Sequence, residues 1–150
     1  MRFFLIDKIR DWQVGKSAEA IKNVALSEDF FDDHYPRHPV MPGVLIIEGI
    51  AQLSGLLLET TAKEKYGRNP KAILAVLERT KFRGLVRPGD TLVYRTELIS
   101  ITKDGGKVKA EALCDGRTVV TTGMTFAFRD IDDAMLEARR AELMKVWMAG

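Results

Sequence analysis

A run of nineteen mostly apolar residues, 44–62, constrains this chain more than any other feature. Pro36 and Pro39 forbid a helix before the run and hold the preceding loop extended, whereas Pro42 suits a first helical turn. A helix this apolar around its circumference is either buried in a protein or crosses a membrane. Acidic residues inside the run, and the lack of a second apolar segment, favour a helix buried by its own chain.

Glu48 lies in the densest part of this run. A carboxylate there costs free energy unless it is paired, protonated or used in chemistry, so Glu48 is a candidate functional residue. A structural ion pair would explain it equally well. Gln52 follows four residues later and shares its helix face. Gly49 and Gly55 weaken the helix by about 1 kcal/mol each relative to alanine, and they permit another group to approach the backbone closely.

The expected start of this helix is itself a candidate site. Backbone N–H groups at Gly43 and Val44 have no partner within the helix, and the helix dipole places partial positive charge there. This is a natural position for a developing oxyanion.

Composition narrows the class of protein. The chain has 150 residues, 46% of them hydrophobic, and a formal net charge of +2, which favours one globular domain and gives no argument for nucleic acid. Cys114 is the single cysteine, and no Cys/His group has zinc spacing, so we expect neither a disulfide nor a metal. No cofactor motif is present. The first residues lack a signal-peptide pattern, which predicts a cytoplasmic protein with no membrane span.

The rest of the chain predicts strands and a second helix. Alternating or apolar runs predict strands at 3–9, 18–26, 72–78, 91–101, 107–115 and 117–128. The strand at 72–78 is a nearly continuous apolar run, which predicts that both of its faces are covered, and 80–86 continues it. Turns are expected at 11–15, 87–90, 103–106 and at Asp115–Gly116, and a helix from Asp130 onward carries a weak stripe of Leu136, Leu143 and Trp147. One long helix followed by a meander of strands predicts an α+β fold in which a sheet wraps the helix. A symmetric dimer would help to cover its apolar surface.

Several motifs, in order, resemble one family. HYPRHPVMPGVLIIEGIAQ, FFLIDKI, AIKNVALSEDFF and LERTKFRGLVRPGDTL are similar to segments of the FabZ-like β-hydroxyacyl-acyl-carrier-protein dehydratases. The resemblance spans residues 3–128. It implies a hotdog fold, in which a long central helix is wrapped by a curved antiparallel sheet. Residues 1–150 would then form a single domain, with 130–150 as an additional C-terminal helical extension.

The resemblance also assigns roles. It implies that His34 and Glu48 are a catalytic pair contributed by opposite subunits of a homodimer, and that Gly43, with Val44, donates backbone N–H groups to the thioester oxygen. Gln52 matches a glutamine near the catalytic glutamate. The implied reaction converts (3R)-3-hydroxyacyl-acyl-carrier-protein to the trans-2-enoyl product. The family also assembles into hexamers, as trimers of dimers.

The residue types fit this chemistry independently. Dehydration of a 3-hydroxyacyl thioester needs a base for the C2 proton, an acid for the departing hydroxyl and a donor for an enolate-like oxygen. A histidine such as His34 is a suitable general base, and a glutamic acid in an apolar setting can hold its proton at neutral pH. Asp33 stands where the family usually has glycine, which adds a carboxylate next to His34 in sequence.

A basic cluster follows the helix in sequence and comprises Arg79, Lys81, Arg83 and Arg87. Such a cluster is commonly a solvated strand face. It also suits docking of an acidic acyl carrier protein, whose acyl chain arrives on a phosphopantetheine arm.

Two other functions remain compatible with the sequence. A hotdog thioesterase would also use an acid on the helix, although the pair of His34 and Glu48 argues against it. A non-catalytic domain could bind an acyl thioester without turnover, although no DNA-binding segment is appended to suggest a regulator.

Overall fold

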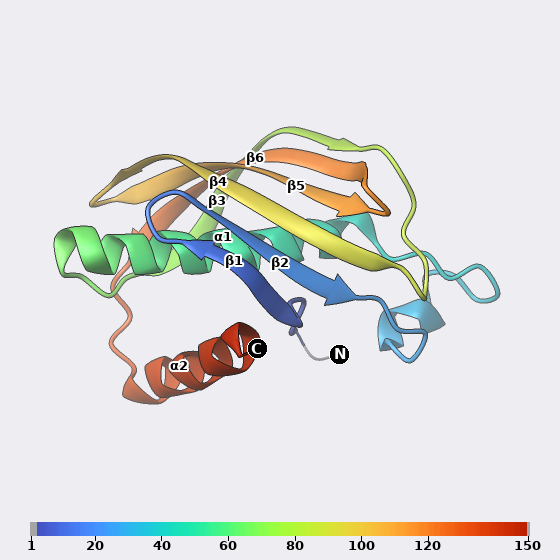
Figure 1. Ribbon diagram of the computed structural model, residues 1–150, viewed down its shortest axis with the longest axis horizontal. Coiled ribbons are helices and arrows are strands. Elements are labelled where there is room, and N and C mark those ends of the chain that lie inside the picture. The colour runs from blue at the N-terminus through green and yellow to red at the C-terminus, as the bar shows by residue number, and fades with distance from the viewer. Residues whose placement is uncertain (1–2, 150) are drawn as a thin grey trace.

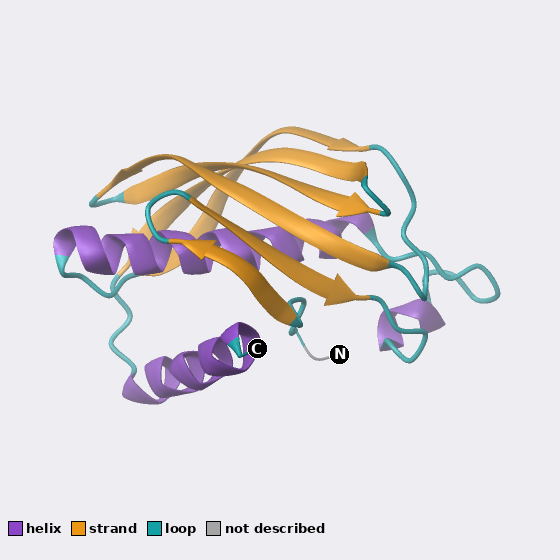
Figure 2. Ribbon diagram, in the orientation of Figure 1, coloured by secondary structure: helices purple, strands orange, loops and turns teal. Residues whose placement is uncertain are grey.

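The computed structural model describes residues 3–149 and contains a mixed set of strands and helices (Figure 1; Figure 2). In chain order they are β1 Lys8–Gln13, β2 Ser17–Asn23, the 3-10 turn η1 Asp29–Asp32, α1 Gly43–Tyr66, β3 Lys71–Phe82, β4 Thr91–Thr102, β5 Gly105–Cys114, β6 Arg117–Arg129 and α2 Ala134–Met148.

The strands form one antiparallel sheet that curves around α1 (Figure 1). Its order is β1-β2-β4-β5-β6-β3, so β1 and β3 are the two edge strands. The predicted α+β arrangement, with a sheet wrapped around a long helix and a further helix at the C-terminus, is confirmed.

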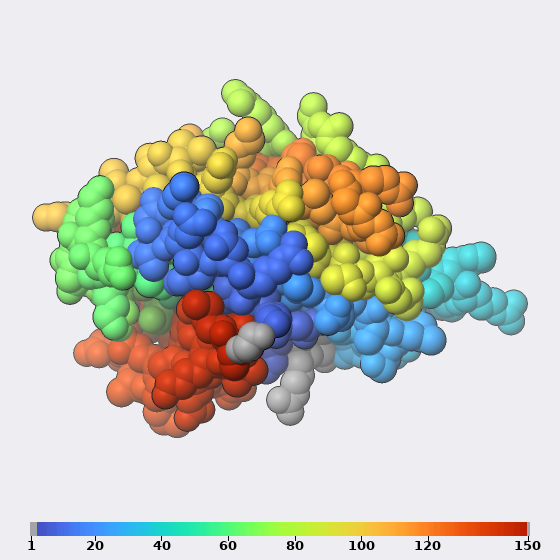
Figure 3. Space-filling model, in the orientation of Figure 1, coloured from blue at the N-terminus to red at the C-terminus, as the bar shows by residue number. Residues whose placement is uncertain are grey.

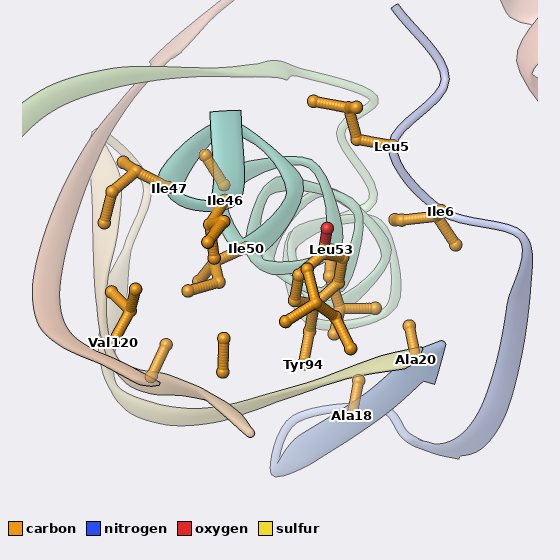
Figure 4. Close-up of a cluster of buried hydrophobic side chains, with 14 of the residues drawn as sticks. Leu5, Ile6, Ala18, Ala20, Ile46, Ile47, Ile50, Leu53, Tyr94 and Val120 are labelled. Atoms are coloured by element: carbon orange, nitrogen blue, oxygen red, sulfur yellow. The ribbon is translucent and has the colours of Figure 1, made fainter. Parts of the chain in front are cut away.

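The core lies between α1 and the concave face of the sheet. Ile50, Leu53 and Leu57 on α1 are fully buried, and so are Leu92 and Tyr94 of β4. Figure 4 shows Ile50, Leu53 and Tyr94 in the space between the helix and the sheet. Burial of side chains of this size stabilises the fold by about 1.5–3 kcal/mol each.

Gly49 is a point of close approach between α1 and the sheet. A Cβ added there would lie under 3.0 Å from the Tyr94 hydroxyl and ring. Figure 4 shows the Tyr94 oxygen directed towards the helix. The sequence predicted that glycines in this helix permit such an approach, and at Gly49 that prediction is confirmed.

The N-terminal strands are shifted from their predicted positions. The first begins at Lys8 rather than at residue 3 and continues to Gln13, through the segment predicted as a turn. The turn itself lies at 14–16, where Gly15 has φ +79°. The apolar side chains of Leu5 and Ile6 still enter the core, which explains why the segment resembles a strand.

The Asp115–Gly116 turn joins β5 to β6 as predicted. Both residues have positive φ, 51° and 76°. This is the backbone of a two-residue type I′ hairpin, whose twist matches that of the flanking strands.

The prediction that 72–78 is covered on both faces is wrong within a single chain. Ile73, Val76 and Leu77 are 47%, 44% and 45% exposed. The reason is position, because β3 runs from residue 71 through 82 as a sheet edge, and residues 3–149 place no further strand beyond it. An apolar run therefore indicated a strand correctly but did not indicate what covers it.

Helix α2 docks below α1 and beside the N-terminal segment (Figure 1; Figure 3). Asp133 caps it by accepting hydrogen bonds from the N–H groups of Met135 and Leu136 at 3.0 and 3.1 Å. The indole of Trp147 is buried and donates to the carbonyl of Ile6 at 2.8 Å. Of the predicted stripe, Trp147 is buried, Leu143 is half-buried, and Leu136 remains 36% exposed.

Helix α1 is also long and apolar enough to cross a membrane by length and composition. However, 61% of its most apolar window is buried inside the structure. That burial is typical of the core helix of a soluble protein, as the sequence predicted.

Candidate active site

His34 lies in the loop that leads from η1 to α1. Its ring is half-buried, and Nδ1 is 2.7 Å from the carbonyl oxygen of Val40. Because a carbonyl only accepts hydrogen bonds, Nδ1 carries the proton, which leaves Nε2 of the neutral ring as an acceptor. The loop thus presents His34 in the tautomer that suits a general base.

The loop is more folded than its prolines predicted. The backbone N–H of Tyr35 donates to the carbonyl of His38 at 3.1 Å, and that of His38 donates back at 3.0 Å. The N–H of Met41 donates to the carbonyl of Val86 at 2.8 Å, which ties the loop to the β3–β4 connection. The segment nevertheless projects from the body of the molecule (Figure 1), and Tyr35 is 55% exposed.

Glu48 lies on α1, where it lines a hollow shared with the N-terminal segment, and its side chain is half-buried. Burial raises the pKa of the carboxyl, while a hydrogen bond from Gln52 opposes part of that shift. The raised pKa favours the protonated form of this carboxyl relative to an exposed one, and a general acid acts from that form.

Gln52 is placed beside Glu48, as the helix spacing predicted, and it also holds the N-terminal segment. Its amide nitrogen donates to the carbonyl of Phe3 at 2.9 Å, and its oxygen accepts from the N–H of Leu5 at 3.2 Å. Gln52 therefore anchors a wall of the site and hydrogen bonds the acid.

The N-terminus of α1 has open backbone donors. Within residues 3–149, the N–H groups of Gly43 and Val44 have no hydrogen-bond partner, and the Val44 side chain is 70% exposed. The ring of Phe82 packs over Gly43, so closely that an added Cβ would lie 2.6 Å from a ring carbon. These donors are available to an oxyanion that arrives from outside the chain.

Glu48 lies at one end of a hollow of about 530 Å³, here called the α1–α2 groove. Helix α1 supplies one wall, and the N-terminal segment, α2 and the sheet supply the others. The lining residues are Phe3, Phe4, Glu48, Ala51, Gln52, Gly55, Leu56, Glu59, Ala72, Ile73, Leu74, Phe126, Arg140, Leu143 and Trp147. His34 is not among them, so a single chain does not bring the predicted catalytic pair together in this groove.

The basic cluster is only partly assembled. Arg79, Lys81 and Arg83 line a wide depression of about 810 Å³ across the outer face of the sheet. Acidic residues are interleaved with them there, namely Asp11, Glu19, Glu78, Glu97 and Glu111. Arg87 lies apart, in the β3–β4 turn, where its N–H donates to Asp90 at 2.8 Å.

Sequence reasoning missed the contribution of α2 to the groove. Arg140 forms an ion pair with Glu59 of α1, and Leu143 and Trp147 line the cavity. The weak apolar stripe of this helix was the available signal in the sequence. Such a stripe indicates that the helix packs against something, but it does not indicate which surface the helix covers.

Asp90, Cys114 and Asp115 form a trio of potential metal-binding groups, with ligand atoms within 4.8 Å of one another. Burial, followed by the neighbouring carboxylates, raises the pKa of the Cys114 thiol.

Solved structures with the same arrangement of helix and sheet define the class. The dehydratase heterocomplex ApeI:P from Xenorhabdus doucetiae superposes with a TM-score of 0.70 at 16% identity, covering 91% of this chain and 90% of that one. A Streptococcus mutans protein bound to acetyl coenzyme A has a TM-score of 0.66 at 14% identity, covering 89% and 96%. These similarities show a hotdog fold.

The family follows from sequence. A model of the FabA-like domain matches residues 1–123, so this chain belongs to the FabA-like family. A 3-hydroxyacyl-[acyl-carrier-protein] dehydratase FabZ from Caldicellulosiruptor bescii is 42% identical over 128 residues, 85% of this chain and 89% of the relative. One from Bacillus cereus is 40% identical, covering 85% and 87%. The expected family is confirmed, and α2 lies beyond the residues that the family model matches.

Proposed function

We propose that this chain dehydrates (3R)-3-hydroxyacyl-acyl-carrier-protein to the trans-2-enoyl thioester in fatty acid or related lipid synthesis, as a cytoplasmic enzyme. One observation carries the proposal. A carboxyl of raised pKa, Glu48, lies at the end of a largely apolar groove in a chain 42% identical to a dehydratase named for this substrate.

The chemistry assigns one proton to each residue. Nε2 of His34 removes the C2 proton, and the electrons move into an enolate-like thioester, whose oxygen accepts from the N–H groups of Gly43 and Val44. Loss of the C3 hydroxyl then forms the double bond, and Glu48 gives that hydroxyl its proton, so that water leaves. The acid and the base each contribute about 10²–10⁴-fold to the rate.

The complete site requires a second copy of the chain. His34 does not line the groove that contains Glu48, and its loop projects from the body. Strand β3 is a long sheet edge with exposed apolar side chains, and such edges are normally paired or covered. These features support a homodimer in which His34 of one subunit faces Glu48 of the other. Further assembly into hexamers would join such dimers.

A thioesterase or a non-catalytic thioester-binding domain is less well supported. A hypothetical thioesterase from Streptococcus pneumoniae has a TM-score of 0.63 at 12% identity, which shows the shared fold alone. Release of a free thiol, or binding without turnover, would identify these alternatives in the assay below.

The direct test is Glu48→Gln. Glutamine preserves the shape of the side chain and cannot give up a carboxyl proton, so we expect turnover to fall by at least about 10²-fold. Formation of the conjugated enoyl thioester is followed by absorbance, and circular dichroism checks the fold. Near-normal turnover by a folded variant would remove Glu48 from the mechanism.

We also propose that Arg79, Lys81, Arg83 and Arg87 help to dock the acidic carrier protein. Three of these side chains share the outer face of the sheet, although nearby acids dilute their charge. Exposed charges act mainly on the rate of association and are screened by salt.

Charge reversal separates docking from chemistry. Lys81→Glu with Arg83→Glu should lower kcat/KM for carrier-protein substrates, and raised salt should do the same to the wild type. Turnover of an N-acetylcysteamine thioester, which has no protein to dock, should be spared. Equal loss on both substrates would indicate damage to the site, and no loss on either would leave the cluster as a solvated strand face.

A further inference from the structure

Helix α2 forms a wall of the α1–α2 groove, although it lies beyond the part of the chain that the family model matches. Two contacts hold it in place. The indole of Trp147 donates to the carbonyl of Ile6 at 2.8 Å, and Arg140 pairs with Glu59 of α1. The helix is therefore docked in a defined position rather than trailing from the sheet.

The α1 residues that line the groove run from Glu48 at one end to Glu59 at the other, here called the Glu59 end. Glu48 and Glu59 are eleven residues apart on α1, which places them about 16 Å apart along the helix. At the Glu59 end the carboxylate is fully engaged, because its second oxygen accepts from the N–H of Ala72 at 2.9 Å. Its partner Arg140 is likewise neutralised, so this end offers no free charge to an anionic ligand.

Between these ends the lining is small or apolar except for Gln52. Gly55 contributes no side chain, and a Cβ added there would meet only Ala72 and Phe126 at 3.7 and 3.8 Å. Leu143 of α2 is half-buried and faces the same space. An alkyl chain suits such a surface, since each methylene removed from water contributes about 0.8 kcal/mol.

We propose that α2 closes the acyl-binding groove and thereby sets the length of acyl chain that the enzyme accepts. The inference rests on the proposed function, because the occupant is the tail of the same substrate whose reacting carbons meet Glu48. The tail runs along α1, contacts Leu143, and stops at the Arg140–Glu59 ion pair. A longer tail would have to displace α2 or break that pair.

The test changes the size of one groove residue in both directions. We compare kcat/KM for the 3-hydroxypalmitoyl thioester with kcat/KM for the 3-hydroxybutyryl thioester. Leu143→Trp should lower this ratio by at least about tenfold, which corresponds to the loss of apolar contact by about two methylenes of the longer chain. Leu143→Ala should raise the same ratio. Leu136→Trp is the matched control, because Leu136 lies on the same helix, is 36% exposed and does not line the groove. It should leave the ratio unchanged.

Other outcomes would overturn the inference. An unchanged ratio in Leu143→Trp, with an unaltered melting temperature, would mean that the tail does not reach α2. If Leu143→Trp lowers kcat/KM equally for both substrates and the dimer is lost in size-exclusion chromatography, a second copy of the chain fills the groove. If the wild type fails to turn over even the 3-hydroxybutyryl thioester, the proposed function fails first, and this inference fails with it.

Discussion

Glu48 and Gly49 are neighbours in sequence but face different surroundings, because successive residues of a helix point about 100° apart around its axis. Gly49 faces the sheet, where Tyr94 leaves no room for a single added carbon. Glu48 faces the α1–α2 groove, where the N-terminal segment, α2 and part of the sheet surround a hollow. The same helix thus packs closely against the sheet at Gly49 and lines a hollow at Glu48.

The difference between the two positions explains how the fold tolerates an acid on this helix. The sheet-facing side excludes water and supplies the burial that stabilises the fold. The groove-facing side is only partly covered. Glu48 is therefore desolvated enough to raise the pKa of its carboxyl, but the side chain remains partly exposed to solvent. Substitutions at the two positions should therefore affect stability in opposite directions.

The largest effect on stability is expected from Gly49→Ala. The added Cβ would overlap the fully buried Tyr94, and overpacking of this kind costs about 1–3 kcal/mol. Chemical denaturation measures the loss. A variant as stable as the wild type would show that the helix and the sheet are not in close contact here.

Two companion variants sharpen this result. Gly55→Ala meets only ordinary contacts on the groove side, so it should be neutral or gain up to about 1 kcal/mol from helix propensity. Tyr94→Phe removes a buried hydroxyl that has no hydrogen-bond partner among the described residues, and it should recover part of the loss in Gly49→Ala.

A smaller effect of opposite sign is expected from Glu48→Gln. Burial raises the pKa of Glu48 in the folded state, so the folded chain binds this proton more tightly than the unfolded chain does. The resulting stabilisation is present at low pH and is lost as pH rises from the ordinary carboxyl range through the raised pKa. Glutamine does not titrate, so the variant should become relatively more stable over that range.

Melting curves at a series of pH values measure this difference. Because the side chain is only half-buried, we expect a gain in Tm of about 2 °C or less at neutral pH, and none at low pH. A variant that melts below the wild type at neutral pH would indicate that Glu48 is a charged structural residue with a stabilising partner.

The sequence predicted the sheet-facing side better than the groove. Apolar periodicity and turn residues identified α1 and the hairpins. Burial of a helix or strand face, and the backbone geometry of a turn, each require particular residue types at neighbouring positions, so both can be read from a short stretch of sequence. Glu48 was found for the same reason, as an acid out of place in an apolar run. The role of Arg140 and Leu143 was missed, since a docking partner 80 or more residues away leaves no local pattern. The exposure of β3 was missed because an apolar strand looks the same whether its own chain or a second copy covers it.

The central claim is that His34 of one subunit and Glu48 of the other form each active site. Mixing inactive His34→Ala with inactive Glu48→Gln protein, after reversible dissociation, tests it directly. Half of the randomly formed dimers are mixed, and each mixed dimer contains one site with both native residues. The account predicts recovery of up to about one quarter of wild-type activity. No recovery in verified heterodimers would place both residues in one subunit and contradict the account.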